Sequence, residues 1–158
     1  MKASTINELK HELANIPSTQ LMELCLRLAR FKKENKELLT YLLFEAHDEH
    51  SYIKNVKQEI DEQFTNINDS NLYFAKKTIR KILRITNKYI RYSGSKTVEI
   101  ELLIHFCSTL NESKIAYQRS TALNNLYNAQ LKKIATAIKS LHEDLQYDYL
   151  KELKQLAE

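Results

Sequence analysis

The sequence predicts an all-α protein, and three observations carry this prediction. Gly and Pro together number two in 158 residues, whereas average usage gives about 19, so tight β-hairpins and Gly-rich phosphate loops lack their usual residues. Apolar side chains recur every three or four positions, as they do on one face of a helix. The composition, 43% hydrophobic and 28% charged, is rich in helix formers such as Leu, Lys and Glu. We expect one domain over residues 1–158, with about seven helices in an antiparallel bundle or a short helical array.

The first two helices are predicted from local capping signals. Thr5 and Glu8 have the spacing of a capping box, so a short helix begins there, and Pro17 ends it. Ser18 is the expected N-cap of a second helix over residues 19–31. Apolar residues cover more than one face of this second helix, which predicts that it lies at the centre of the fold.

Two further helices follow a polar turn at residues 32–35. The third helix carries apolar residues through Ala46, and the fourth has a stripe over residues 53–67 with spacings of 3, 4, 4 and 3. One unbroken helix over residues 36–67 would be about 48 Å long. Since such a length is awkward in a compact domain, we expect a break near Asp48.

The second half of the chain predicts three helices and an amphipathic tail. The fifth helix spans residues 71–92 and ends at Gly94, the only glycine, because a left-handed C-terminal cap favours glycine. Ser95 is the expected cap of the sixth helix. The seventh helix spans about residues 120–141, and residues 144–156 continue it or form an eighth helix.

Positive charge concentrates in residues 71–96. This segment has eight Lys and Arg residues and no Asp or Glu, whereas the net charge of the whole chain is +4. Five of these cations are spaced 4, 3, 4 and 3, so they form one row along a helix, opposite its apolar face. This row, termed the basic stripe, consists of Lys77, Lys81, Arg84, Lys88 and Arg91.

The basic stripe is the candidate site for nucleic acid or another anion, because cations in register with aromatic rings suit phosphates and bases. The candidate residues are Lys77, Lys81, Arg84, Lys88, Tyr89, Arg91, Tyr92 and Lys96. In one alternative, acidic residues 45–70 pair antiparallel with this helix and neutralise the stripe through ion pairs. In another, the last cations of the segment hold a phosphate at the N-terminus of the sixth helix, or simply complement the C-terminal dipole of the fifth.

Other polar patterns favour structural roles. The His-Asp-Glu-His run at residues 47–50 lacks the Glu-x-x-His pairs of helical di-iron sites and predicts a polar helix junction. Glu101 and His105 lie one turn apart among apolar residues, which predicts a hydrogen-bonded histidine and not a general base. Cys25 and Cys107 belong to no C-x-x-C pair, and the chain has no G-x-S-x-G motif. We expect no catalytic residues, no metal site and no cofactor.

The predicted function is a non-enzymatic interaction module that binds a protein partner or a second copy of itself. Tyr147 and Tyr149 lie on the amphipathic tail, which needs a surface to cover in the same chain or in another copy. The alternative function is nucleic-acid or polyanion binding through residues 71–96. Reduced thiols, no visible signal peptide and no apolar run of membrane-spanning length predict a cytoplasmic protein without a membrane partner.

Overall fold

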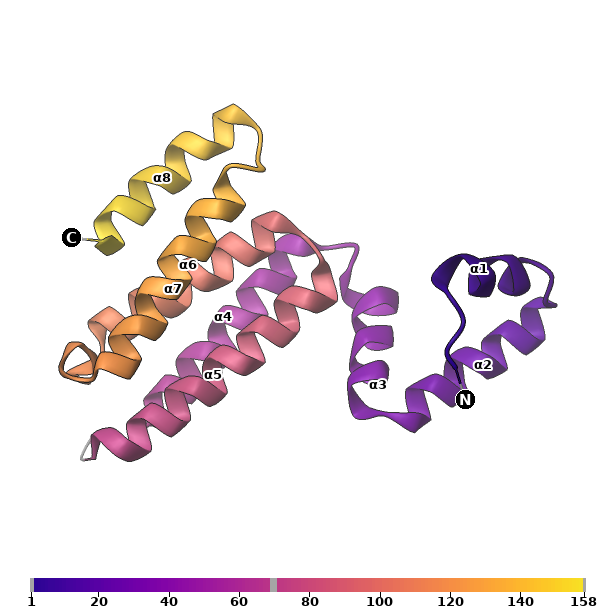
Figure 1. Ribbon diagram of the computed structural model, residues 1–158, viewed down its shortest axis with the longest axis horizontal. Helices are drawn as coiled ribbons and strands as arrows, with labels where there is room; N and C mark the ends of the chain where they lie inside the picture. The colour runs from indigo at the N-terminus through magenta and orange to yellow at the C-terminus, as the bar shows by residue number, and fades with distance from the viewer. Residues whose placement is uncertain (1, 69–70, 158) are drawn as a thin grey trace. The chain divides into compact units, whose positions relative to one another are not determined.

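The computed structural model describes residues 2–68 and 71–157, and helices account for most of them (Figure 1). These residues form eight α-helices and no strand, which confirms the all-α class and makes the C-terminal tail a helix of its own. The chain divides into two compact units, residues 1–44 and 45–158. That these units act as one domain stays a prediction.

The N-terminal unit contains α1 (Ile6–Ala14), α2 (Ser18–Phe31) and α3 (Lys33–Thr40), followed by a π-helical turn at Tyr41–Glu45. The capping box of α1 is present: the Thr5 hydroxyl accepts from the Glu8 backbone N–H, and the Glu8 carboxylate accepts from that of Thr5. The predicted cap of α2 is wrong, because Pro17 is the N-cap. Its ring fixes φ at −58°, in the extended conformation of a cap, and Ser18 is already helical.

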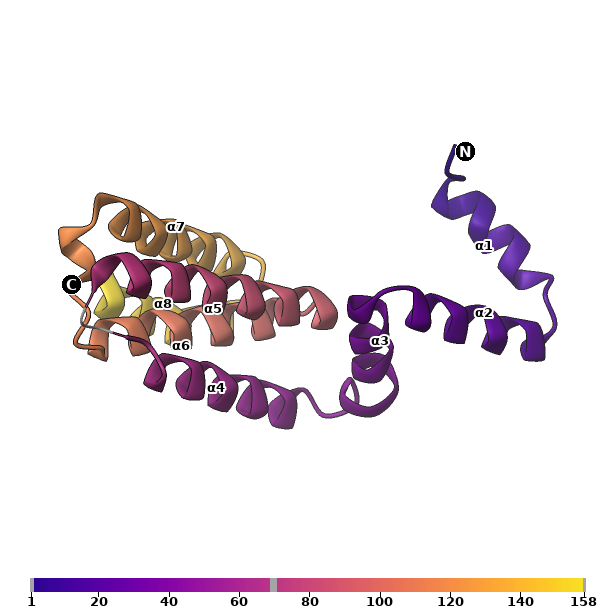
Figure 2. The same ribbon diagram turned by 90° about the horizontal axis from the view of Figure 1, so that it is seen from below.

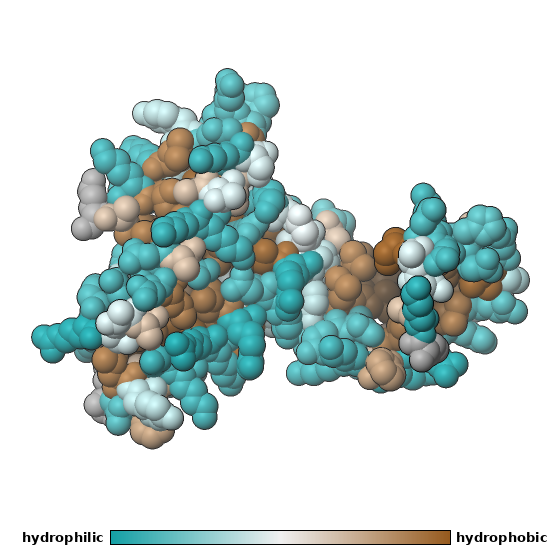
Figure 3. Space-filling model, viewed as in Figure 1, coloured by the Kyte–Doolittle hydropathy of each residue, from teal (hydrophilic) through white to brown (hydrophobic). Residues whose placement is uncertain are grey.

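The prediction that α2 lies at the centre of the fold is also wrong. None of α1, α2 and α3 has a buried residue, and apolar side chains reach the surface of this unit in Figure 3. A unit of 44 residues has too few elements to cover every apolar face of its helices. The exposed side chains are Ile6, Leu9, Leu13, Leu21, Met22, Leu24, Leu26, Leu28, Phe31, Leu42, Leu43 and Phe44.

The second unit is built around one helix. It comprises α4 (Glu49–Thr65), α5 (Leu72–Ser93), α6 (Lys96–Glu112), α7 (Thr121–Ile138) and α8 (Glu143–Ala157), with successive helices antiparallel (Figures 1 and 2). The other four helices all contact α6. Because four helices contact it, α6 is apolar around most of its circumference. Its buried residues are Val98, Glu99, Ile100, Leu102, Leu103, Ile104, Phe106, Cys107 and Leu110.

Local caps fix the ends of the helices beside the candidate site. The predicted break is present at Asp48, whose carboxylate accepts from the Ser51 N–H at 3.0 Å and caps α4. Gly94 ends α5 with a left-handed φ of 65°, as predicted, and its N–H donates to the Ile90 carbonyl. Ser95 then caps α6. Gly94 and Ser95 together form the turn that joins α5 to α6.

Candidate functional site

The basic stripe lies on the face of α5 that points away from the core. The apolar face of α5 is buried, and its buried residues are Ala75, Ile79, Ile82, Leu83, Thr86 and Ile90. Lys77, Lys81, Arg84 and Arg91 are exposed, and Lys88 is half-buried. Arg80, which precedes Lys81 in the chain, is exposed as well. The helical spacing therefore places four of the five predicted cations in contact with solvent.

The carboxylates of α4 do not neutralise this face. Within residues 2–68 and 71–157, no ion pair joins Lys77, Lys81 or Arg84 to an acidic side chain. Asp61 contacts the His105 ring instead, at 2.7 Å, and Glu59 accepts from the Tyr89 hydroxyl at 2.9 Å. Glu59 and Asp61 of α4 are thus engaged elsewhere, and no carboxylate of residues 2–68 or 71–157 compensates the positive charge at these three positions.

The C-terminal part of the predicted site has a structural role. The hydroxyl of Tyr89 bonds to α4, and its ring lies edge-on to Tyr92, with centroids 6.2 Å apart. The ammonium of Lys88 lies 5.2 Å from the Tyr89 ring centroid and 5.9 Å from that of Tyr92, in cation–π geometry. Tyr89 thus contributes to the packing of α4 against α5, and the side chains of Lys88 and Tyr92 contact its ring.

The N-terminus of α6 already holds a carboxylate of the chain itself. Glu99, in the first turn of α6, is buried and lies 2.7 Å from the Lys96 ammonium and 3.4 Å from that of Lys133. Burial opposes ionisation of Glu99, but its hydrogen bonds and the charges of both lysines outweigh burial and lower the pKa of the carboxyl. Lys96 is therefore paired with a carboxylate of its own chain. Glu99 thus provides the negative charge in the first turn of α6, where one alternative from the sequence places a bound phosphate.

An exposed aromatic ring extends the stripe at its other end. Tyr73 precedes Lys77 by four residues, which puts it on the same face of α5, and it is 72% exposed. Its ring lies edge-on to the ring of Phe74, with centroids 5.5 Å apart. Tyr73 is not among the candidate residues predicted above, although the same four-residue spacing, followed towards the N-terminus, identifies it.

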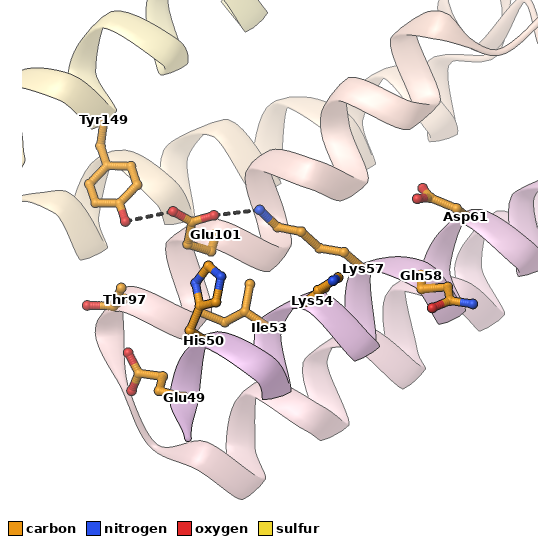
Figure 4. Close-up of a pocket in the computed structure, with 10 residues that line it drawn as sticks. All are labelled: Glu49, His50, Ile53, Lys54, Lys57, Gln58, Asp61, Thr97, Glu101 and Tyr149. Atoms are coloured by element: carbon orange, nitrogen blue, oxygen red, sulfur yellow. Dashed lines mark hydrogen bonds and ion pairs between the residues drawn. The ribbon is translucent and has the colours of Figure 1, made fainter. Parts of the chain in front are cut away.

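A polar cluster joins α4, α6 and α8 at the edge of an open pocket (Figure 4). Glu101 accepts from the Lys57 ammonium at 2.5 Å and from the Tyr149 hydroxyl at 2.8 Å. Burial opposes ionisation of Glu101, but its two hydrogen bonds and the charge of Lys57 outweigh burial, so the pKa of the Glu101 carboxyl is lowered. The pKa of the Tyr149 hydroxyl is raised by burial and by its hydrogen bond to the Glu101 carboxylate. Tyr149 thus packs α8 onto its own chain, and each carboxylate oxygen of Glu101 has a partner.

Stability is expected to fall in acid because of this cluster. A carboxyl whose pKa is lower in the folded than in the unfolded chain stabilises the fold fully when the pH is above its ordinary pKa, which is 4.5 for glutamate. That contribution is lost as the pH falls through the folded value. We expect Glu101→Gln to weaken the pH dependence of the urea midpoint below about pH 4.5. Glu112→Gln, which removes an exposed carboxylate from the same helix, is the control; equal pH profiles for both variants would contradict the assignment.

The histidine-containing motifs make structural contacts. His105 is hydrogen-bonded to Asp61, and the run at residues 47–50 forms the junction that Asp48 caps. In the described part of the chain, no three His, Cys, Asp or Glu side chains form a group that could hold a metal ion. No helix formed by those residues is both long and apolar enough to cross a membrane.

The N-terminal unit has an apolar groove along α2 and α3, with a volume of about 660 Å³. Leu26, Ala29, Leu39, Thr40, Leu43 and Phe44 line it, together with the cations Arg30, Lys33 and Lys36. Among the residues that the structure describes, no acidic one lines the groove, although Lys33 forms an ion pair with Glu37, its neighbour one turn later, at 3.6 Å. Cys25 lines a second, smaller groove between the same two helices.

Comparison of the chain with protein families, curated proteins and solved structures finds no match. The function of the chain is therefore inferred from the residues of two surfaces with distinct chemistry. These surfaces are the apolar groove of α2 and α3 and the cationic face of α5.

Proposed function

We propose that the chain is a non-enzymatic interaction module whose N-terminal unit binds an amphipathic helix of a protein partner. The observation that supports this proposal is the exposure of twelve large apolar side chains on residues 1–44. Soluble proteins rarely leave so many apolar groups together in water, because covering them lowers the free energy. A helix laid into a groove is a common way to cover such a surface.

Charge complementarity identifies the chemistry of the partner helix. Five apolar side chains line the groove of α2 and α3, and the polar side chains that line it are three cations and one threonine, with no carboxylate among the described residues. A partner helix therefore requires an apolar stripe flanked by Asp or Glu, which would meet Arg30 and Lys36 at the edges. A helix flanked by lysines would place like charges against the same residues.

A pair of model peptides tests this proposal on the full chain. One labelled peptide of about 18 residues carries a leucine stripe flanked by Glu, and the other carries Lys in place of each Glu. In fluorescence anisotropy we expect the Glu peptide to bind more tightly than the Lys peptide. We expect Leu43→Glu to weaken that binding roughly tenfold or more, since an anchor residue of a groove is lost. Leu150→Glu, at an exposed position of α8, is the matched control.

Three outcomes would overturn the proposal. The first is equal affinity for both peptides, and the second is an unchanged affinity in Leu43→Glu. The third is a concentration-dependent dimer, seen by light scattering, that Leu43→Glu converts to a monomer, because the groove would then belong to a second copy of the chain.

A further inference from the structure

We propose that the exposed face of α5 binds single-stranded nucleic acid. This inference concerns residues 73–91, and it does not depend on the partner of the N-terminal unit. Its first support is the open groove on α5 lined by Lys77, Thr78, Arg80, Lys81 and Arg84. Four of these five residues are cations, and no ion pair joins any of the four to a carboxylate among the described residues.

The linear arrangement of the cations favours a polymer of phosphates over a small anion. At 1.5 Å per residue, the row Lys77, Lys81 and Arg84 is about 10 Å long, with a cation every 4.5–6 Å along the axis, and Arg91 lies about 10 Å further along α5. A small anion needs cations that converge on one point, whereas a row of this kind follows a phosphate backbone. The concentration of charge also raises the local concentration of a polyanion, since α5 has no acidic residue.

The aromatic ring at the start of the row favours a single strand. Tyr73 is 72% exposed on the same face as Lys77, so an unstacked base can lie against its ring. Base stacking on an aromatic side chain is the usual second component of single-strand binding, beside the cations. A duplex keeps its base faces inside its own stack and gains nothing from Tyr73.

A lipid surface suits this face less well. A helix that binds at a membrane interface inserts its apolar side beneath the headgroups. The apolar side of α5 is buried in the second unit, where Ala75, Ile79 and Ile82 are inaccessible to solvent. Of the aliphatic and phenylalanine side chains of α5, Leu72 and Phe74 in its first turn are exposed, and one turn is too short to insert as the apolar side of an interfacial helix.

The test measures binding of the full chain to labelled oligothymidine of about 20 nucleotides, and to a duplex of the same length, by fluorescence anisotropy. If each of the four cations of the groove contacts one phosphate, the affinity for the single strand falls about 50-fold between 50 and 200 mM salt. In Lys81→Gln/Arg84→Gln we expect weaker binding and a salt slope that is smaller by about 1.4. Lys139→Gln/Lys154→Gln, which removes the same charge at exposed positions outside α5, is expected to bind like the unaltered chain.

A second variant tests the role of the ring. We expect Tyr73→Ala to lower the affinity for the single strand roughly tenfold with an unchanged salt slope, because stacking and not charge is lost. Tyr147→Ala, at a residue 75% exposed on α8, is the control, and circular dichroism checks that each variant is folded.

Four results would overturn the inference. Three concern nucleic acid: no salt-dependent binding at 50 mM salt, equal binding by the two charge-removal double variants, and a duplex affinity at least equal to that for the single strand with Tyr73→Ala silent. Tighter binding to anionic vesicles than to oligothymidine would assign the face to lipid and also overturn it. None of these results would contradict the proposal that the apolar groove of the N-terminal unit binds a helix.

Discussion

Replacement of Phe106 by Ala is expected to lower the free energy of unfolding by about 3–5 kcal/mol. Phe106 is completely buried in α6, the helix that the rest of its unit surrounds, and its ring packs against that of Phe64 with centroids 5.6 Å apart. Neighbouring side chains are held by several helices at once, so they cannot close the cavity that the missing ring leaves. Urea unfolding of the full chain measures the change.

The matched control is the same substitution at Phe31. This ring is 84% exposed at the end of α2, so Phe31→Ala is expected to change the free energy of unfolding by no more than about 0.5 kcal/mol. A loss below about 1 kcal/mol for Phe106→Ala, or similar losses for both variants, would contradict the central place of α6 in the fold.

The two units are expected to differ completely when each is produced alone. Residues 1–44 should be largely unfolded, because α1, α2 and α3 have 9, 14 and 8 residues and no buried side chain. Helices this short are marginal in water without packing. Residues 45–158 contain the core around α6 and should keep a cooperative transition.

Far-UV circular dichroism with urea titration of both fragments measures this difference. We expect low helicity and no transition for residues 1–44, and a single sigmoidal transition for residues 45–158. A cooperative transition in the shorter fragment would show that its helices are stabilised without a partner. Failure of the longer fragment to fold would show that its core needs the N-terminal residues.

Helix boundaries could be predicted from sequence where the determining contact is local. The Thr5 capping box, the Asp48 cap and the left-handed Gly94 each involve residues within four positions of one another. Burial is a different matter. Apolar residues on several faces of α2 indicate which side chains would gain from burial, but the pattern does not show whether other helices of the chain pack against them. In the structure, the central helix is α6 and not α2.

The candidate site shows the same division. Periodicity predicts that Lys81 and Arg84 share a face, because that depends on α5 alone. Periodicity cannot predict that Lys96 forms an ion pair with Glu99. Nor can it predict that Lys81 forms none with a carboxylate of residues 2–68 or 71–157, because both results depend on the directions of the side chains in three dimensions. The Glu101 cluster was missed for this reason, because its partners are 44 and 48 residues away along the chain.

The two cysteines will differ in reactivity. Burial in α6 raises the pKa of Cys107 to about 12, so its thiol stays protonated and unreactive at neutral pH. Cys25 is half-buried between α2 and α3, where an alkylating reagent can reach it. A single maleimide fluorophore would therefore attach to the native chain beside the apolar groove, without any engineered mutation, and its emission would respond when a helix displaces water there.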